Sequence, residues 1–216
     1  MDHADFVPPA PQQLPQHLDA WDRYYHADSP DSLVQLAIVH AQFEFLHPFL
    51  DGNGRLGRLL IPLFLFEKKL LTRPAFYLSS YLERYREAYV GRLRAIGREP
   101  NAWQAWCEFF LDAVIAQAEA NAEQVRQVQS LYELYKQRAA ETTHSEFAAA
   151  LIDAIFEGPI FSTTQVSQRP GMPSRSAVLA LLDRMLTAGM LQILEPARGQ
   201  RPQLWICSEL LALCER

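Results

Sequence analysis

Apolar and aromatic side chains recur at three- and four-residue spacing along most of the chain, which is the pattern of amphipathic helices. Residues 14–25 form the first such segment. A second helix is predicted to begin with Ser29 as N-cap and Pro30 at its first position, and to end at Pro48. A third segment, from about residue 55 to residue 70, is apolar on nearly every side, so we expect it to be the central helix of a bundle.

The helical pattern continues over residues 81–96 and again from Asn101, which is expected to cap a long helix that reaches beyond residue 135. No strand-like alternation occurs before residue 140. Near the N-terminus, the prolines within residues 6–11 predict an extended arm or the edge of a hairpin, because proline lacks a donor and holds its predecessor extended.

The last third of the chain changes character and predicts a winged helix. Two helix-length patterns flank a short one, and two alternating runs follow, separated by a segment with Pro and Gly. The apolar period is lost near residues 138–145, which predicts a first domain of residues 1–140 and a second of residues 144–216. The helical segments are residues 147–156, 164–168 and 175–188, and the hairpin strands are residues 192–194 and 203–207.

Composition and charge narrow the class of protein. With 216 residues, of which 49% are apolar, the chain can bury a sizeable core. It has 20 Lys and Arg against 25 Asp and Glu, and the net charge of -5 excludes a global positive field for nucleic acid or anionic lipid. The three cysteines lack metal-ligand spacing, which is typical of reduced thiols. Neither a membrane span nor a signal pattern occurs, so we expect a cytoplasmic protein without membrane association.

Residues 47–58 combine a histidine, a Gly-Asn-Gly turn and two arginines. The backbone N–H groups of Gly52, Asn53 and Gly54 can form an anion-binding concavity, and the helix that begins there adds its own unpaired donors. Arg55 and Arg58 lie three residues apart on this helix, so both guanidinium groups reach the same mouth. The segment therefore predicts a polyphosphate cradle.

Two further side chains of this segment predict chemistry beside the cradle. Asp51 offers a hard oxygen ligand, which suits a Mg²⁺ ion that bridges phosphates, so the predicted ligand is ATP with Mg²⁺. His47 lies at the other lip of the loop, where an imidazole can take a proton from an incoming hydroxyl. These residues suit attack at the α-phosphorus of ATP with release of pyrophosphate.

Residues 47–58 also fill every defined position of the Fic signature, His-x-Phe-x-(Asp/Glu)-Gly-Asn-Gly-Arg-x-x-Arg, and the chain resembles the Fic family over about residues 5–135. The resemblance implies a mainly α fold: a Fic-type helical bundle with a short N-terminal flap hairpin near residues 5–11, followed by a small winged-helix domain. It implies a protein adenylyltransferase whose partner is a target protein with a Ser, Thr or Tyr hydroxyl. By position, it implies His47 as base, Phe49 as a buried anchor, Asp51 on the metal, Asn53 beside the α-phosphate, Gly52 and Gly54 in the anion hole, and Arg55 and Arg58 on the β- and γ-phosphates.

The resemblance makes three further expectations. Gly54 is the small residue expected for AMP transfer, since Doc-like relatives that act as kinases have a lysine there. Tyr85 and Tyr89 are assigned to the adenine side of the site. The inhibitory helix of many relatives, Ser/Thr-x-x-x-Glu-Gly/Asn, has no counterpart, because Phe147 follows the only similar run. We therefore expect either a truncated, constitutively active form that modifies itself, which is favoured, or an inhibitory glutamate from a partner protein.

Other readings remain open at this stage. The same site could use another nucleotide or a phosphocholine donor, or remove AMP, whereas a P-loop ATPase is disfavoured because no Gly-Lys-Ser/Thr follows the turn. His40 is expected to be a core histidine. In a third reading the chain is a DNA-binding regulator with a nucleotide-sensing Fic core. The arginines of the winged helix, at positions 175, 184, 198 and 201, are balanced by acids, which favours protein docking or a homodimer over DNA contact.

Overall fold

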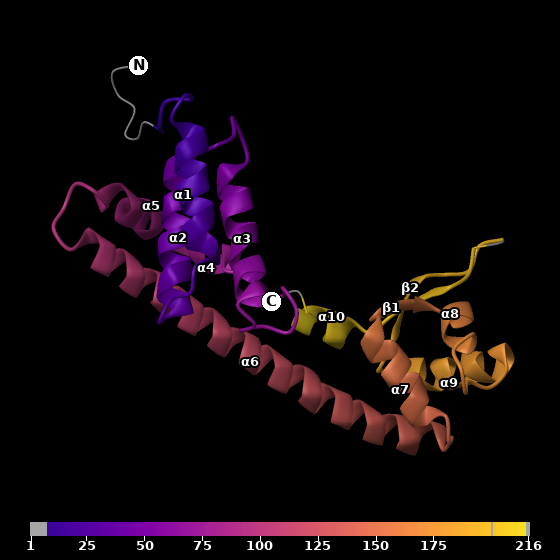
Figure 1. Ribbon diagram of the computed structural model, residues 1–216. Helices are drawn as coiled ribbons and strands as arrows, with labels where there is room; N and C mark the ends of the chain where they lie inside the picture. Colours follow the sequence, from indigo (N-terminus) through magenta and orange to yellow (C-terminus); the bar gives the residue numbers. More distant parts are fainter. Residues whose placement is uncertain (1–7, 200, 215–216) are drawn as a thin grey trace. The chain divides into compact units, whose positions relative to one another are not determined.

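The computed structural model describes residues 8–199 and 201–214. The chain forms two compact units, residues 1–119 and residues 120–216, each with its own core (Figure 1). The predicted flap near residues 5–11 lies largely outside the described residues, and residues 8–10 have no regular secondary structure. None of the described helices combines the length and apolar character needed to cross a membrane.

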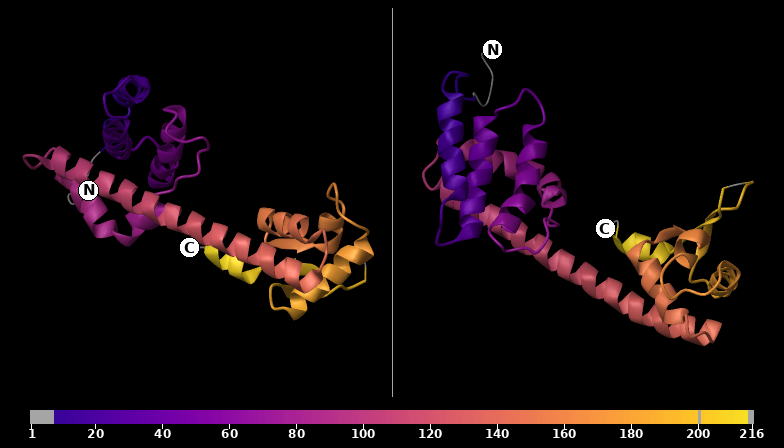
Figure 2. Two further views of the ribbon diagram at one scale, coloured as in Figure 1. Left: turned by 90° about the horizontal axis from the view of Figure 1, so that it is seen from below. Right: turned by 45° about the vertical axis from the view of Figure 1, so that its right-hand side comes forward.

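The first unit is helical, as predicted. Helices α1, α2 and α3 run side by side, with α2 in contact with both of the others (Figures 1 and 2). The pattern over residues 81–96 predicted one helix, but two short helices meet there at Tyr85, whose φ of -108° and ψ of 34° interrupt the helical path. The helices of this unit are α1 (Leu14–His26), α2 (Ser32–Leu46), α3 (Asn53–Glu67), α4 (Ser79–Arg84), α5 (Arg86–Ala95) and the first part of α6 (Ala102–Thr143).

The start of α2 corrects one prediction. Asp31, rather than Ser29, is the N-cap, and its Oδ1 accepts hydrogen bonds from the backbone N–H groups of Leu33 at 2.9 Å and Val34 at 3.1 Å. A carboxylate satisfies two of the unpaired N–H groups of the first turn, and its charge is favourable at a helix N-terminus. Pro30 consequently lies before the cap and not in the first turn.

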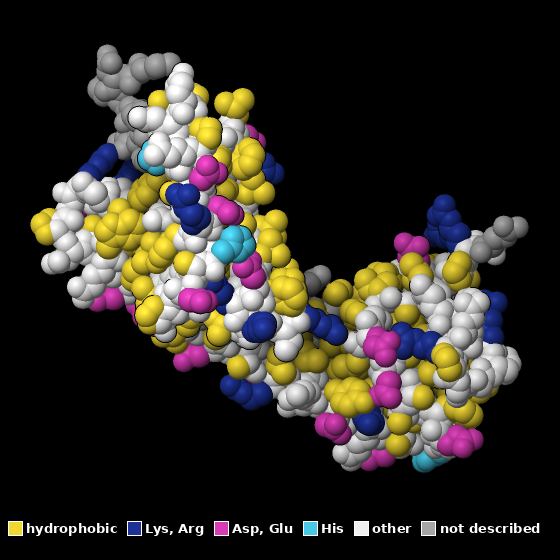
Figure 3. Space-filling view, in the orientation of Figure 1, with side chains coloured by type: hydrophobic (Ala, Val, Ile, Leu, Met, Phe, Trp, Pro, Cys, Tyr) yellow, Lys and Arg dark blue, Asp and Glu magenta, His cyan; other side chains and the backbone are white. Residues whose placement is uncertain are grey.

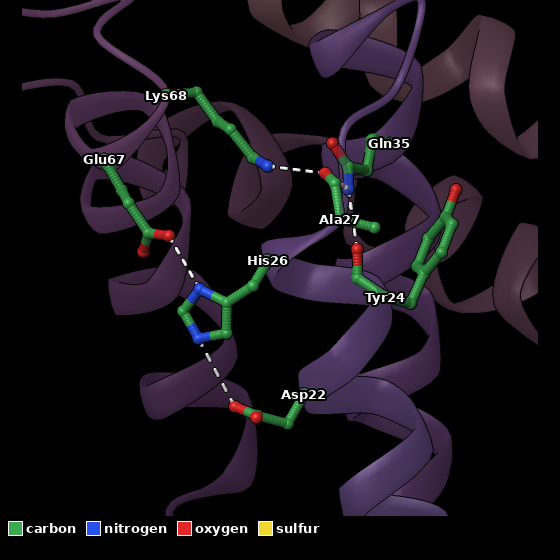
Figure 4. Close-up of polar contacts among 7 residues, drawn as sticks. All are labelled: Asp22, Tyr24, His26, Ala27, Gln35, Glu67 and Lys68. Carbon is green, nitrogen blue, oxygen red and sulfur yellow. Dashed lines mark hydrogen bonds and ion pairs between the residues drawn. The ribbon is translucent and has the colours of Figure 1, made fainter.

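Tryptophan side chains fix α2 within the first unit, and polar contacts join the end of α1 to the end of α3. The indole Nε1 of Trp106 donates to the carbonyl of Ala37 at 2.8 Å, and that of Trp21 donates to the carbonyl of Val39 at 2.9 Å. At the far end of α3, His26 lies 2.7 Å from Glu67 and the ammonium of Lys68 donates to the carbonyl of Ala27 at 2.7 Å (Figure 4). These contacts hold the two helices between which residues 47–52 lie.

The second unit has the element order predicted for a winged helix, with one strand and one helix added. Its small antiparallel sheet has the order β1-β3-β2. Strand β1 and helix α10 were not predicted. The elements after α6 are α7 (Ala148–Glu157), β1 (Ile160–Ser162), α8 (Thr163–Ser167), α9 (Arg175–Thr187), β2 (Gln192–Glu195), β3 (Leu204–Ile206) and α10 (Ser208–Cys214).

Helix α6 contributes to the cores of both units. Trp106 and Phe110 belong to the first core, whereas Leu131, Tyr135 and Ala139 belong to the second. The loss of the apolar period near residues 138–145 coincides with the end of α6 at Thr143. The division between the two packed units lies earlier, between residues 119 and 120, because the second half of α6 packs with the winged helix.

Candidate active site

The connection between α2 and α3 places a histidine in an unusual backbone conformation. His47 is the C-cap of α2, with φ of 45° and ψ of 53°, and its N–H donates to the carbonyl of Phe43 at 3.1 Å. A residue other than glycine rarely adopts left-handed dihedrals, and such strain is common at functional sites. Because Pro48 cannot continue a helix, α2 ends here and the imidazole is exposed at the lip of the loop.

The loop is closed by one side chain. Asn53 is 2% exposed, and its carboxamide bonds both backbone groups of Phe49: Nδ2 donates to the carbonyl at 2.6 Å and Oδ1 accepts from the N–H at 3.0 Å. The resemblance implied that Asn53 lies beside the α-phosphate. In the structure its polar atoms are instead used to hold residues 49–53 in a fixed turn.

The expectation that Phe49 is a buried anchor is wrong. Its ring is 52% exposed, and the neighbouring side chain of Leu50 is fully exposed. The loop needs no buried ring because the paired bonds from Asn53 to the backbone of Phe49 already fix its position. An exposed Phe49 beside His47 instead forms part of the surface that an incoming substrate would meet.

The N-terminus of α3 is open for an anion. Gly52 is its N-cap, with φ of 85°, a left-handed value that glycine adopts without steric cost. The first hydrogen bond of the helix runs from Leu56 N–H to the carbonyl of Gly52 at 2.9 Å, and no side chain caps this end. The N–H groups of Asn53, Gly54 and Arg55 precede this bond, so they point toward the loop mouth, as in phosphate-binding helix termini.

Asp51 and Arg55 form an exposed pair beside this terminus. Their side chains are 92% and 76% exposed, and Arg55 Nη2 lies 3.3 Å from Asp51 Oδ2. The other carboxylate oxygen of Asp51 accepts from Gly52 N–H at 2.7 Å. An ion pair this exposed contributes little to stability, so either group can exchange its partner for a phosphate or a cation.

Gly54 leaves room for the second arginine of the segment. A Cβ at Gly54 would lie 3.4 Å from Arg58 Nη1, which is tighter than most such contacts. A lysine at this position, as the resemblance implies for kinases, would therefore press on Arg58. His47 at the end of α2, Asp51 in the connection, and Arg55 and Arg58 in the first turns of α3 thus lie on one short segment that joins the two helices.

A buried polar network lies beneath the loop. His40 is 2% exposed; its Nδ1 lies 3.1 Å from the carbonyl of Gly57, and its Nε2 lies 3.0 Å from the hydroxyl of Tyr89. Because a carbonyl only accepts, Nδ1 carries the proton and Nε2 accepts from Tyr89. Burial, aided by the charge of Arg58, lowers the pKa of His40 to about 4, so its ring is neutral near pH 7. The expectation of a core histidine at position 40 is confirmed.

The burial of His40 predicts acid lability of the first unit. The folded state resists protonation down to about pH 4, whereas the unfolded chain takes up the proton below its ordinary value of 6.5, so stability falls as the pH is lowered between these values. The expected loss is roughly 3 kcal/mol. Burial raises the pKa of Glu44, which acts in the opposite direction, so the difference between wild type and His40→Phe isolates the effect. Urea unfolding from pH 7 to pH 4 should show a shallower pH dependence in the variant; parallel curves would contradict the prediction.

The two tyrosines assigned to the adenine side lie in different environments. Tyr89 is 8% exposed, and its hydroxyl is bonded to His40, so it is part of the core beneath the loop. Burial beside Glu44 raises its pKa strongly. Tyr85 is 46% exposed, and its ring lies 4.6 Å from that of Tyr81. The structure does not bring these two side chains together at the loop mouth.

Sequence reasoning missed Glu44. This carboxyl group lies on α2, one turn before His47 and one turn after His40, and its side chain is 14% exposed. An isolated acid within the apolar run of a buried helix was the signal that could have identified it, because a carboxylate is almost never buried without a partner.

Residues 47–58 thus combine an exposed histidine with an uncapped helix N-terminus. A comparison with known families matches residues 1–65 to the Fic/DOC family. Residues 1–65 are thus similar to the Fic/DOC family, and residues 47–58 lie within the matched segment.

Curated relatives agree with this assignment. A probable protein adenylyltransferase of Aquifex aeolicus is 34% identical over 91 residues, which are 42% of this chain and 28% of the relative. The protein adenylyltransferase Fic of Nematostella vectensis is 38% identical over 61 residues, 27% of this chain and 14% of the relative. The chain thus spans less than a third of the length of either relative. A crystal structure of a Fic family protein from Desulfovibrio desulfuricans aligns with 92% of this chain and 56% of its own, at 24% identity and a TM-score of 0.46.

Proposed function

We propose that this protein transfers AMP from ATP to the hydroxyl of a Ser, Thr or Tyr side chain, on a target protein or on itself. One observation carries the proposal: a solvent-facing histidine lies on the same short loop as the uncapped N-terminus of a helix that bears two arginines. The names of the curated relatives, which are protein adenylyltransferases, support the same activity.

Each group of the loop has its own role in the proposed reaction. The hydroxyl oxygen attacks the α-phosphorus and forms a new P–O bond, while the bond from the α-phosphorus to the bridging oxygen breaks and pyrophosphate leaves. His47 takes the hydroxyl proton. The N–H groups at the start of α3 bind phosphate oxygens, and the guanidinium groups of Arg55 and Arg58 neutralise the polyphosphate.

Asp51 fits a Mg²⁺ ion that the reaction would need. Its carboxylate is a hard oxygen donor at the loop mouth and is 92% exposed, while the described residues contain no group of three or more His, Cys, Asp or Glu that would form a complete cage. Magnesium usually takes one or two carboxylates and completes its shell with water and substrate phosphates, so a single ligand suffices. When bound, the ion would neutralise phosphate charge.

We also propose that the reaction takes place in the cytoplasm. The three cysteines are free thiols, and burial raises the pKa of Cys107 and Cys207, so thiolate reactivity is suppressed. A reducing compartment suits such thiols. The open end of α3 leaves the phosphate side of the site accessible to ATP in the form described.

The deciding experiment compares α-labelled with γ-labelled ATP, with the chain alone and with cell lysate as a source of targets. We expect label on protein from the α position only, and self-labelling in the chain alone. Labelling from the γ position alone would mean that the protein is a kinase. No labelling from either position would rule out the proposed transfer of AMP from ATP. Labelled UTP, CTP and CDP-choline would then test the alternative donors.

A second candidate function, DNA binding by the winged helix, is favoured by one observation. A cavity of about 750 Å³ lies between α8, the start of α9 and the β2–β3 hairpin, with Arg175 and Arg201 among its lining residues. None of the described residues that line it is acidic, and Thr164, Gln165 and Gln203 add polar groups. Charges of both signs are interspersed over the face shown in Figure 3.

Binding to duplex DNA tests this second function. If the groove contacts phosphates, Arg175→Ala should weaken binding and reduce the slope of log K against log salt by about one. Arg169→Ala is the matched control, because Arg169 is paired with Glu157 at 2.8 Å on another part of the same unit. Equal effects of both variants, or no salt-dependent binding by wild type, would leave protein docking as the role of the winged helix.

A further inference from the structure

Glu44 is a buried acid that the signature segment does not contain. Its Oε1 is fully shielded from solvent and has no hydrogen-bond partner among the described residues. The carboxylate lies against the glycine face of α3: a Cβ at Gly57 would overlap Oε1, and a Cβ at Gly54 would lie 4.0 Å from both oxygens. Gly54 and Gly57 therefore leave room for this side chain.

Charged and titratable groups face Glu44 from three helices. From α2, His40 Nε2 lies 4.0 Å from Oε1, and His47 is one turn away. Arg58 approaches from α3. Its Nη1 would lie 3.4 Å from a Cβ at Gly54, and both carboxylate oxygens of Glu44 would lie 4.0 Å from that same Cβ. From α5 comes the hydroxyl of Tyr89. Arg94 and Arg98 line the cavity of about 440 Å³ that Glu44 also borders.

The influences on the pKa of Glu44 indicate which of these groups interacts with its carboxylate most strongly. Burial raises the pKa of Glu44, and the positive charge of Arg58 is the largest influence that opposes this rise, ahead of His47 and Tyr89. The neutral ring of His40 offers no charge. An isolated buried carboxylate is costly, whereas one that faces a guanidinium attracts it and restricts its position.

We propose that Glu44 is the positioning residue of Arg58, and that its carboxylate holds the guanidinium at the polyphosphate end of the loop. Glu44 does not touch the nucleotide; it acts through Arg58, which binds the phosphates beyond the α-phosphate. The inference rests on the proposed function only in taking ATP as the ligand. Affinity for the distal phosphates should therefore depend on Glu44, whereas affinity for AMP, which lacks them, should not.

Calorimetric titration with ATP and with AMP tests this inference. All variants are made in a His47→Ala background, so that binding is measured without transfer. Glu44→Gln keeps the shape and removes the charge, and we expect it to weaken ATP binding about tenfold while AMP binding changes less than twofold. Glu44→Asp, which keeps the charge, should recover part of the ATP affinity. Glu87→Gln, an exposed acid on α5, is the matched control and should bind both nucleotides as the background does.

Gly57→Ala provides an independent probe if Glu44→Gln does not fold. Its added methyl group displaces the carboxylate without removing its charge, so the same selective loss of ATP affinity is expected. Equal losses for ATP and AMP, tighter ATP binding, unchanged ATP binding, or no ATP binding by the background would each overturn the inference. A selective loss in a protein that transfers no label from α-labelled ATP would instead support the role of Glu44 and remove the proposed reaction.

Discussion

Replacing His47 with alanine is expected to reduce AMP transfer by about a thousandfold or more. The proposal gives this imidazole the proton of the attacking hydroxyl, and a positioned general base contributes about 10²- to 10⁴-fold to a rate. Transfer of label from α-labelled ATP measures the loss.

His144→Ala is a closely matched control for this variant. His144 also follows the last turn of a helix, with φ of 48°, an N–H that donates to the carbonyl of Ala140 at 2.9 Å, and an exposed side chain. It differs in lying between α6 and α7, in the second unit and outside residues 47–58. We expect His144→Ala to keep wild-type transfer. Similar losses in both variants would reflect backbone relaxation, and full activity of His47→Ala would exclude it as the base.

Measurements of nucleotide binding should distinguish the role of His47 in proton transfer from a role in phosphate binding. The N–H groups at the start of α3 and the guanidinium groups of Arg55 and Arg58 remain in His47→Ala, so the variant should bind ATP as wild type does. A parallel loss of ATP affinity and transfer would show that His47 supports the loop and not the proton transfer. This distinction matters because a side chain of the loop can support its backbone, as Asn53 does through its hydrogen bonds to Phe49.

The sequence predicted the loop better than its surroundings, for a physical reason. Pro48 restricts the backbone and the glycines at 52 and 54 permit a turn, so the end of α2, the turn and the start of α3 could be located from neighbouring residues alone. The partners of His40 could not. Tyr89 is 49 residues away, and helical spacing shows which side of a helix is buried but not which side chain it meets.

The resemblance predicted the environment of a side chain least well where that side chain could take either of two roles. Phe49 was expected to anchor the loop through its ring, but the backbone of the same residue is what Asn53 holds. Tyr89 was assigned to a ligand and lies in the core. Glu44, which no motif position includes, turned out to face Arg58. For Tyr89 and Glu44 the deciding contacts join different helices, and only packing determines them.

Trp106 joins the first core to the residues beneath the loop. This side chain is fully buried on α6; its ring stacks on His40 at 6.2 Å with an interplanar angle of 6°, and lies 5.8 Å from the ring of Tyr89. Its Nε1 also donates to the carbonyl of Ala37 on α2. The residues beneath the loop therefore depend on one indole for both packing and hydrogen bonding.

Trp106→Ala is accordingly expected to destabilise the first unit by about 3 to 5 kcal/mol, the range for removing a buried aromatic side chain. Trp103→Ala, three residues earlier on the same helix and 40% exposed in wild type, should cost much less. Scanning calorimetry of the whole chain measures both, since the two cores should give separable transitions. The transition of the winged helix should stay in place in Trp106→Ala. Equal shifts of both transitions would show that α6 unfolds as one body and couples the two cores through its 42 residues.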